Sequence, residues 1–171
     1  LFALSSDYEK SDKATQMFFA ETQNKLLYAV THKTAAELIV SRADASQPNM
    51  GLTTWKGSIV RKGDVVIAKN YLQNEEIDSL NRLVDIFLTS AEERVKGRRD
   101  LTLDYWRKNV DSLLTFQEKD ILQGAGSITN YEAEETAKQV YDVFNTKRKQ
   151  LEARAADADD LKMLDDLERR I

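Results

Sequence analysis

A single proline, Pro48, interrupts this chain of 171 residues, and only six glycines accompany it. Proline and glycine are the residues that most strongly oppose helix formation. Elsewhere, apolar residues recur at three- and four-residue steps, which is the spacing of one helix face. We therefore expect an all-α protein, an irregular bundle of about six helices with one long ordered loop at residues 41–60 and a C-terminal helix.

Capping residues and glycines predict where the helices begin and end. Thr34 and Thr129 each stand three residues before a glutamate, which is the spacing of a capping box, and Ser11 and Thr102 are suitable N-caps. The segment VRKGDVVI at residues 60–67 is β-branched and could form a strand, but we favour a helix at 64–72 because AKNYL continues it. The expected helices, in chain order, cover residues 11–30, 34–41, 64–72, 74–96, 102–123 and 129 onward.

From residue 155 onward the chain turns acidic and carries apolar residues at helical spacing. These residues are Leu161, Leu164, Leu167 and Ile171. A helix with an uncovered apolar stripe requires a partner surface. We therefore divide the chain into a helical domain at 1–154 and an acidic helix at 155–171 that is a possible oligomerisation element.

Composition narrows the possible functions. With no cysteine and one histidine, His32, the chain has no thiol chemistry and too few ligands for a structural zinc site. The net charge of −4 argues against non-specific nucleic-acid binding by the whole chain. No apolar run approaches the roughly 20 residues that cross a bilayer. We expect a cytoplasmic protein with no membrane contact, no cofactor and no metal, and its leucine start indicates part of a longer chain.

His32 and the glycine-rich segment at 124–126 are two motifs that could carry chemistry. His32 could act as a general base or metal ligand, but a polar residue at a helix end is the simpler interpretation. Gly124-Ala-Gly126 lacks the third glycine and the preceding strand of a dinucleotide-binding motif, so we interpret it as a turn.

The segment SRADASQPNMGLTTWKG, residues 41–57, mixes a turn, an aromatic ring and several polar groups. Loops of this length inside compact domains are usually functional or disordered. The simpler, structural interpretation of this segment is a turn at residues 48–51 with a tryptophan that packs on the core. Its functional interpretation is a candidate polar site made of Glu37, Arg42, Asp44, Asn49, Thr53, Trp55 and Lys56.

Basic residues are concentrated in two further stretches. One follows the loop, and the other surrounds the junction of two helices near residue 97. If folding brings them together, they would suit a phosphate backbone, although helix-end charges on a solvated surface are the simpler explanation. The nucleic-acid candidates are Arg61, Lys62, Arg94, Arg98, Arg99 and Arg107.

Several long strings resemble the virulence protein RhuM family of bacteria. They are NKLLYAVTHKTAAELIVSRADASQPNMGLTTWKG at 24–57 and VRKGDVVIAKNYL at 60–72, with FALSSDYEKSDKATQMFFAETQNK, DLTLDYWRKNVDSLL and LQGAGSI elsewhere. The resemblance covers nearly the whole chain. It implies a C-terminal domain of a protein about twice as long, whose missing N-terminal part would be the main DNA-binding module. The resemblance also implies that members of the family have a glycine at the position of His32.

Some members of this family are described as DNA-binding and others as related to Fic/Doc toxins. Fic enzymes need a His-x-Phe-x-Asp/Glu-Gly-Asn-x-x-Arg loop, but His32 is followed by Lys-Thr-Ala-Ala-Glu. We therefore expect a non-enzymatic C-terminal domain for interaction or effector recognition that forms homo-oligomers. One alternative is a toxin-like enzyme acting on nucleic acid or nucleotide, in which Arg42 and Lys56 hold phosphate. The other is direct DNA binding through residues 94–108.

Overall fold

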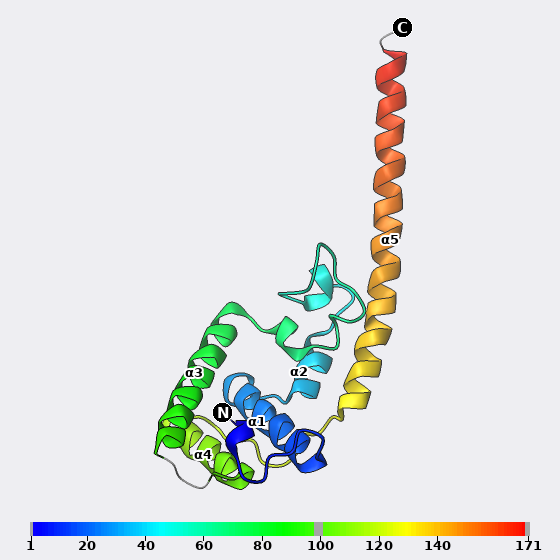
Figure 1. The fold of residues 1–171 in the computed structure, drawn as a ribbon. Coiled ribbons are helices and arrows are strands. Elements are labelled where there is room, and N and C mark those ends of the chain that lie inside the picture. Colours follow the sequence, from blue (N-terminus) through cyan, green and yellow to red (C-terminus); the bar gives the residue numbers. More distant parts are fainter. Residues whose placement is uncertain (1, 98–100, 170–171) are drawn as a thin grey trace.

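The computed structural model describes residues 2–97 and 101–169, apart from the side chains of residues 167 and 168. Within this part of the chain the regular structure is entirely helical, which confirms the expected all-α class. Figure 1 shows a compact body and one long helix that extends away from it. The elements are η1 (Phe2–Leu4), α1 (Lys13–Thr31), α2 (Ala35–Arg42), η2 (Pro48–Gly51), η3 (Ala68–Tyr71), α3 (Asn74–Lys96), α4 (Leu103–Phe116) and α5 (Asn130–Glu168).

The body consists of two packed groups of helices. Helix α1 packs against α3 and α4, whereas α2 packs against η3 and the first part of α5. Aromatic side chains fill the first group, where the Phe2 ring lies 5.5 Å from the rings of both Phe18 and Trp106. Phe18 and Trp106 are fully buried. Burying a side chain of this size contributes about 1.5–3 kcal/mol, so this cluster is a major source of the body's stability.

Local capping determines where most of the helices start. Thr34 and Glu37 form the predicted capping box of α2. Thr129 and Glu132 exchange the corresponding bonds before α5, and the Thr102 hydroxyl accepts the predicted bond at α4. The prediction for α1 was wrong by one residue, because its N-cap is Asp12 rather than Ser11.

The helix predicted at residues 64–72 was wrong, and so was the alternative strand at 60–67. Only the 3₁₀ turn η3 forms there. The carboxylate of Asp64 accepts bonds from the backbone N–H groups of Lys56 and Arg61, while the Asn70 amide donates to the Asp64 carbonyl. Side-chain bonds of this kind offer the backbone an alternative to a helix ladder, and here they hold the segment in turns.

Helix α4 also ends earlier than the glycines predict. It stops at Phe116, and Glu118 then takes a left-handed conformation with φ of 52°. Gly124 and Gly126, both with positive φ, lie in the non-helical connection to α5. The glycines therefore shape the connection rather than terminate the helix.

The long connection between α2 and α3 has its own buried residues. Met50 and Val65 are fully buried, and Leu52 and Val60 are nearly so. The connection is therefore a packed segment, and the loop expected at 41–60 forms its first part from residue 43 onward, because α2 continues through Arg42. Within it, Gly51 has a φ of +82°, and a Cβ atom at this position would lie 2.4 Å from the carbonyl oxygen of Arg42.

Helix α5 is 39 residues long and runs without a break through the predicted boundary at residue 155. Ala133, Ala137 and Tyr141 on its first turns are buried against the body. From residue 149 to residue 166 every residue is exposed. At 1.5 Å per residue the helix is about 58 Å long, and Figure 1 shows its C-terminal part projecting from the body.

We predict that Gly51→Ala destabilises the fold much more than Gly57→Ala. Both glycines have positive φ, so both substitutions incur a left-handed strain of about 1 kcal/mol. At Gly57 no atom lies within 4 Å of the added Cβ, whereas at Gly51 the Arg42 carbonyl must move. The expected loss in the free energy of unfolding is therefore about 3 kcal/mol for Gly51→Ala, measured by urea titration. Equal losses for the two variants would contradict the close approach.

Candidate functional site

Arg42 forms the strongest polar contact of the candidate site. Its two Nη atoms each donate to one carboxylate oxygen of Glu76 at 2.6 Å, and Nη1 also donates to the Tyr71 carbonyl oxygen at 2.7 Å. The Arg42 side chain lowers the pKa of Glu76, and Glu76 in turn raises the pKa of Arg42. Two-point pairing of this kind is directional and strong. Arg42 therefore joins the end of α2 to the start of α3.

Glu37 connects α2 to the segment that precedes α5. Besides its capping bond to Thr34, its Oε1 accepts the backbone N–H of Ser127 at 2.7 Å and the Ser127 hydroxyl at 2.8 Å. These bonds lower the pKa of Glu37 to about 2, the backbone N–H of Thr34 being the largest cause and that of Ser127 the next. Gly126 permits this approach, because a Cβ there would lie 2.7 Å from Thr34.

Asp44, Asn49 and Thr53 shape the backbone of the loop. Asp44 accepts bonds from the backbone N–H and hydroxyl of Ser46, which lower its pKa. Asn49 has a left-handed φ of 52° inside η2. The Thr53 hydroxyl donates to the Leu72 carbonyl at 2.6 Å, linking an inner part of the connection to its end.

Trp55 and Lys56 complete the predicted set. Trp55 is half-buried and packs against the core, as the structural interpretation of the loop predicts. Lys56 is exposed, and its backbone N–H donates to Asp64. Glu37, Arg42 and Asp44 thus bond to different structural partners. Among the residues that the structure describes, no group of three or more His, Asp or Glu side chains could hold a metal ion.

The predicted nucleic-acid residues also lie in separate places. Lys62 pairs with Asp142 of α5 at 2.9 Å, and Arg61 neighbours it on the loop. Arg107 pairs with Glu21 at 2.8 Å, with its guanidinium 5.7 Å from the centre of the Phe18 ring. Arg94 lies in the last turn of α3, and Arg98 and Arg99 fall outside the described residues.

Figure 1 shows the C-terminal end of α3 and the cyan loop at opposite ends of the body. Arg94, in the last turn of α3, therefore lies far from the basic residues of the loop. Direct DNA binding through residues 94–108 stays a prediction that rests on the second cluster alone.

His32 occupies the C-cap of α1 and has a left-handed φ of 55°. Its backbone N–H donates to the Tyr28 carbonyl, and its Nδ1 lies 3.4 Å from a carboxylate oxygen of Asp120 on the surface. Glycine is favoured at such helix ends because it adopts positive φ without strain. The geometry thus accounts for the glycine that the family resemblance implies at this position, and it supports the structural interpretation of His32.

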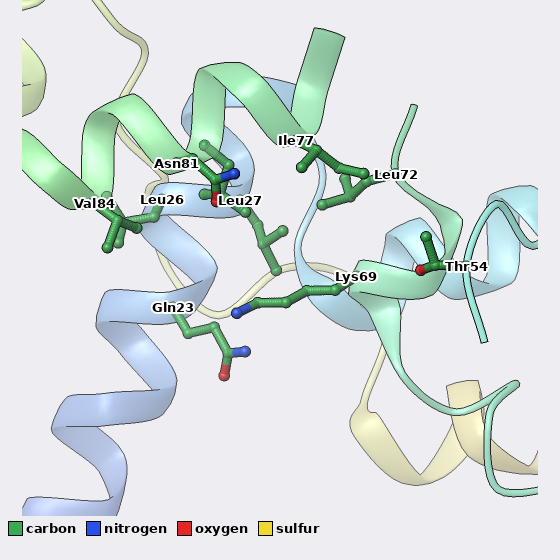
Figure 2. A pocket seen from close by; sticks show the side chains of 10 residues that line it. Gln23, Leu26, Leu27, Thr54, Lys69, Leu72, Ile77, Asn81 and Val84 are labelled. Carbon is green, nitrogen blue, oxygen red and sulfur yellow. The ribbon is translucent and has the colours of Figure 1, made fainter. Parts of the chain in front are cut away.

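A pocket of about 310 Å³ lies between α1, α3 and η3, as Figure 2 shows. Leucine, isoleucine and valine side chains form most of its wall, and Lys69 is the one charged residue among those that line it. Figure 2 shows Lys69 and Gln23 extending toward each other at one edge. The lining residues are Gln23, Leu26, Leu27, Thr54, Lys69, Leu72, Ile77, Leu80, Asn81 and Val84.

A second hollow, which we call the loop groove, lies between residues 45–49 and α5. Its volume is about 610 Å³. The loop contributes a largely uncharged wall, and α5 contributes Phe144, Lys147, Arg148, Leu151 and Glu152. The Arg148 guanidinium donates to the Val60 carbonyl, which holds the loop against α5 beside the groove.

Sequence reasoning missed Met50 and Lys69. Met50 is fully buried and anchors the loop more deeply than Trp55 does. An apolar residue inside a polar turn was a signal that could have identified it. Lys69 was not among the candidate residues, and its position beside the pocket depends on how α1, α3 and η3 come together, which no local pattern encodes.

Protonation of Glu37 should make the stability of the protein depend on pH. Because its pKa is lowered from 4.5 in the unfolded chain to about 2 in the fold, the charged form stabilises the fold above pH 4.5, and this stabilisation disappears as pH falls towards 2. Glu37→Gln should therefore be less stable than the natural protein in urea at pH 7, and the difference should shrink at pH 3. Glu92→Gln, an exposed change on α3, is the control. A difference that is equal at both pH values would contradict this role.

Comparison with known protein families gives a match over most of the chain. The model of the virulence protein RhuM family matches residues 1–152, and the chain therefore belongs to that family. Neither a curated protein nor a solved structure showed a significant match. None of the described helices is long and apolar enough to cross a membrane.

Proposed function

We propose that this chain is the C-terminal interaction domain of a bacterial RhuM-type protein and that it associates with a second copy of itself through α5. The observation that carries the proposal is the exposure of the C-terminal part of that helix. Leu151, Leu161 and Leu164 are each about 60% exposed, and Met163 is exposed as well. Large apolar side chains gathered on a projecting element are typical of an interaction surface.

The way in which the body uses its polar groups supports a binding role over catalysis. A catalytic pair needs side chains that reach the same reacting atom. Here Glu37 bonds to Ser127, Arg42 bonds to Glu76, and Asp44 bonds to Ser46. These bonds hold segments of the protein together. DNA binding by a region that precedes this domain remains part of what the family resemblance implies.

Sedimentation should show an increase in mass with protein concentration that disappears when residues 157–171 are deleted. The deletion leaves the body intact, because residues 149–166 are exposed and the buried part of α5 ends near Tyr141. Circular dichroism of the deleted protein provides the control for folding. A natural chain that remains a monomer at high concentration would rule out self-association.

Recognition of a small effector is a second candidate function, favoured by the pocket in Figure 2. The pocket combines an apolar wall with one exposed lysine and two amides, Gln23 and Asn81. A ligand with an apolar body and one carboxylate would complement this lining, because the ammonium would offset the ligand's charge. We propose amphipathic carboxylates as the ligand class for this site.

Octanoate should raise the melting temperature of the protein, and octylamine should not. Lys69→Ala should abolish the shift caused by octanoate, because it removes the charged group beside the pocket. Lys56→Ala removes an exposed lysine that does not line the pocket and should leave the shift unchanged. If octanoate and octylamine give equal shifts, recognition of the carboxylate is wrong.

A further inference from the structure

We propose that the partner of α5 is the α5 helix of a second copy in antiparallel orientation, with its acidic end beside the loop groove. This inference rests on the proposed self-association and adds the orientation, the register and the residues that meet. Three observations carry it: the distribution of charge along α5, the spacing of its exposed residues, and the position of the groove.

The charges of α5 are separated along its length. Residues 147–154 carry four basic side chains and one acid, Glu152. Residues 157–166 carry five aspartates and one basic residue, Lys162. Two parallel helices in register would bring like charges together, whereas two antiparallel helices place the basic stretch of each copy against the acidic stretch of the other. Complementary charge of this kind selects the orientation of helix pairs.

The spacing of exposed residues defines one face of α5. Residues at alternating four- and three-residue steps share the face of a helix that meets a partner. On α5 these residues are Lys147, Leu151, Arg154, Ala158, Leu161 and Asp165.

When Leu151 of one copy faces Leu161 of the other, the remaining residues of the face fall into matched pairs. Lys147 then faces Asp165 of the second copy, and Arg154 faces Ala158. Each contact occurs twice, because the pairing is symmetric about residue 156. The small Ala158 leaves room for Arg154 to extend toward the neighbouring aspartates. The paired stretch, 147–165, covers about 27 Å of helix.

This register brings the acidic end of each helix to the loop groove of the other copy. Asp165 of the second copy would lie beside Lys147, which lines the groove together with Arg148 and Leu151. The two bodies would then stand at opposite ends of the paired helices. Such an arrangement avoids a clash between the bodies, because each α5 projects away from its own body (Figure 1).

The absence of cysteine allows a direct test of the orientation. Two single variants, Leu151→Cys and Leu161→Cys, are prepared separately and mixed under oxidising conditions. The antiparallel pair predicts a disulfide-linked dimer that contains one chain of each variant and little product from either variant alone. In the antiparallel pair, two copies of residue 151 lie ten positions apart, about 15 Å along the axis, which is too far for a disulfide.

Charge reversal tests the register. Lys147→Glu should raise the dissociation constant of the dimer about tenfold, because two attractive pairs become repulsive. The double variant Lys147→Glu, Asp165→Lys should restore association. Lys149→Glu makes the same change in net charge on the opposite face of the helix, so it should alter the constant less than about twofold.

The outcomes separate this inference from the proposed function. Disulfides within each single variant, 151 to 151 and 161 to 161, would show a parallel pair, which overturns the orientation and retains self-association. Equal effects of Lys147→Glu and Lys149→Glu in a dimer would overturn the register. A chain that stays monomeric in every experiment would overturn both proposals. Mixed disulfides with rescue by the double variant would support both.

Discussion

The two-point contact between Arg42 and Glu76 closes the longest irregular segment of the fold. These residues are 34 positions apart, and the segment between them contains only two short 3₁₀ turns. Closing so long a segment costs conformational entropy, and a strong contact between its two ends helps to offset that cost. The Arg42 guanidinium group brings the two ends of the segment together, and it also donates a hydrogen bond to the Tyr71 carbonyl oxygen. Met50 and Val65 can then fill the space beneath it, so the buried interior of the segment depends on this contact.

The direction of α5 in turn depends on α2. Helix α2 has only eight residues, too few to be stable alone, and it is held by its capping box, by Arg42 and by packing. The same Glu37 that caps α2 also bonds to Ser127, three residues before α5 begins. Buried Ala133 and Ala137 then let α5 approach α2 closely. The direction in which α5 leaves the body is therefore determined by α2 and by one carboxylate at its start.

Local patterns predicted the features that local physics controls. The caps of α2, α4 and α5 were correct because a threonine three residues before a glutamate or a backbone N–H satisfies the same bonds in any context. The helix expected at residues 74–96 from apolar spacing was correct as well, since Leu80, Leu83 and Phe87 of α3 are buried on it. The segment at 60–72 was not predictable in this way. Its conformation depends on Asp64 and Asn70 bonding across turns, and propensity does not account for such bonds.

The candidate site illustrates the same limit. The loop was identified by its composition, but composition does not reveal partners, and the carboxylate that pairs with Arg42 lies on a helix beyond the loop. The pocket beside Lys69 and the groove beside Lys147 arise from segments distant in sequence. The charges and leucines of α5, by contrast, could be located from the sequence, because they are arranged along a single continuous helix.

The exposure of the last part of α5 has a consequence for its own secondary structure. No described residue from 149 to 166 is covered by the body, so this stretch depends on intrinsic helix propensity and on neighbouring side-chain pairs such as Lys162 with Asp159. Isolated helices of such length are only marginally stable in water, although here the anchored first half already supplies a nucleus. The helical content of this stretch should thus vary with occupancy of its surface. Hydrogen exchange at its amides would then report binding directly, without any label or added probe.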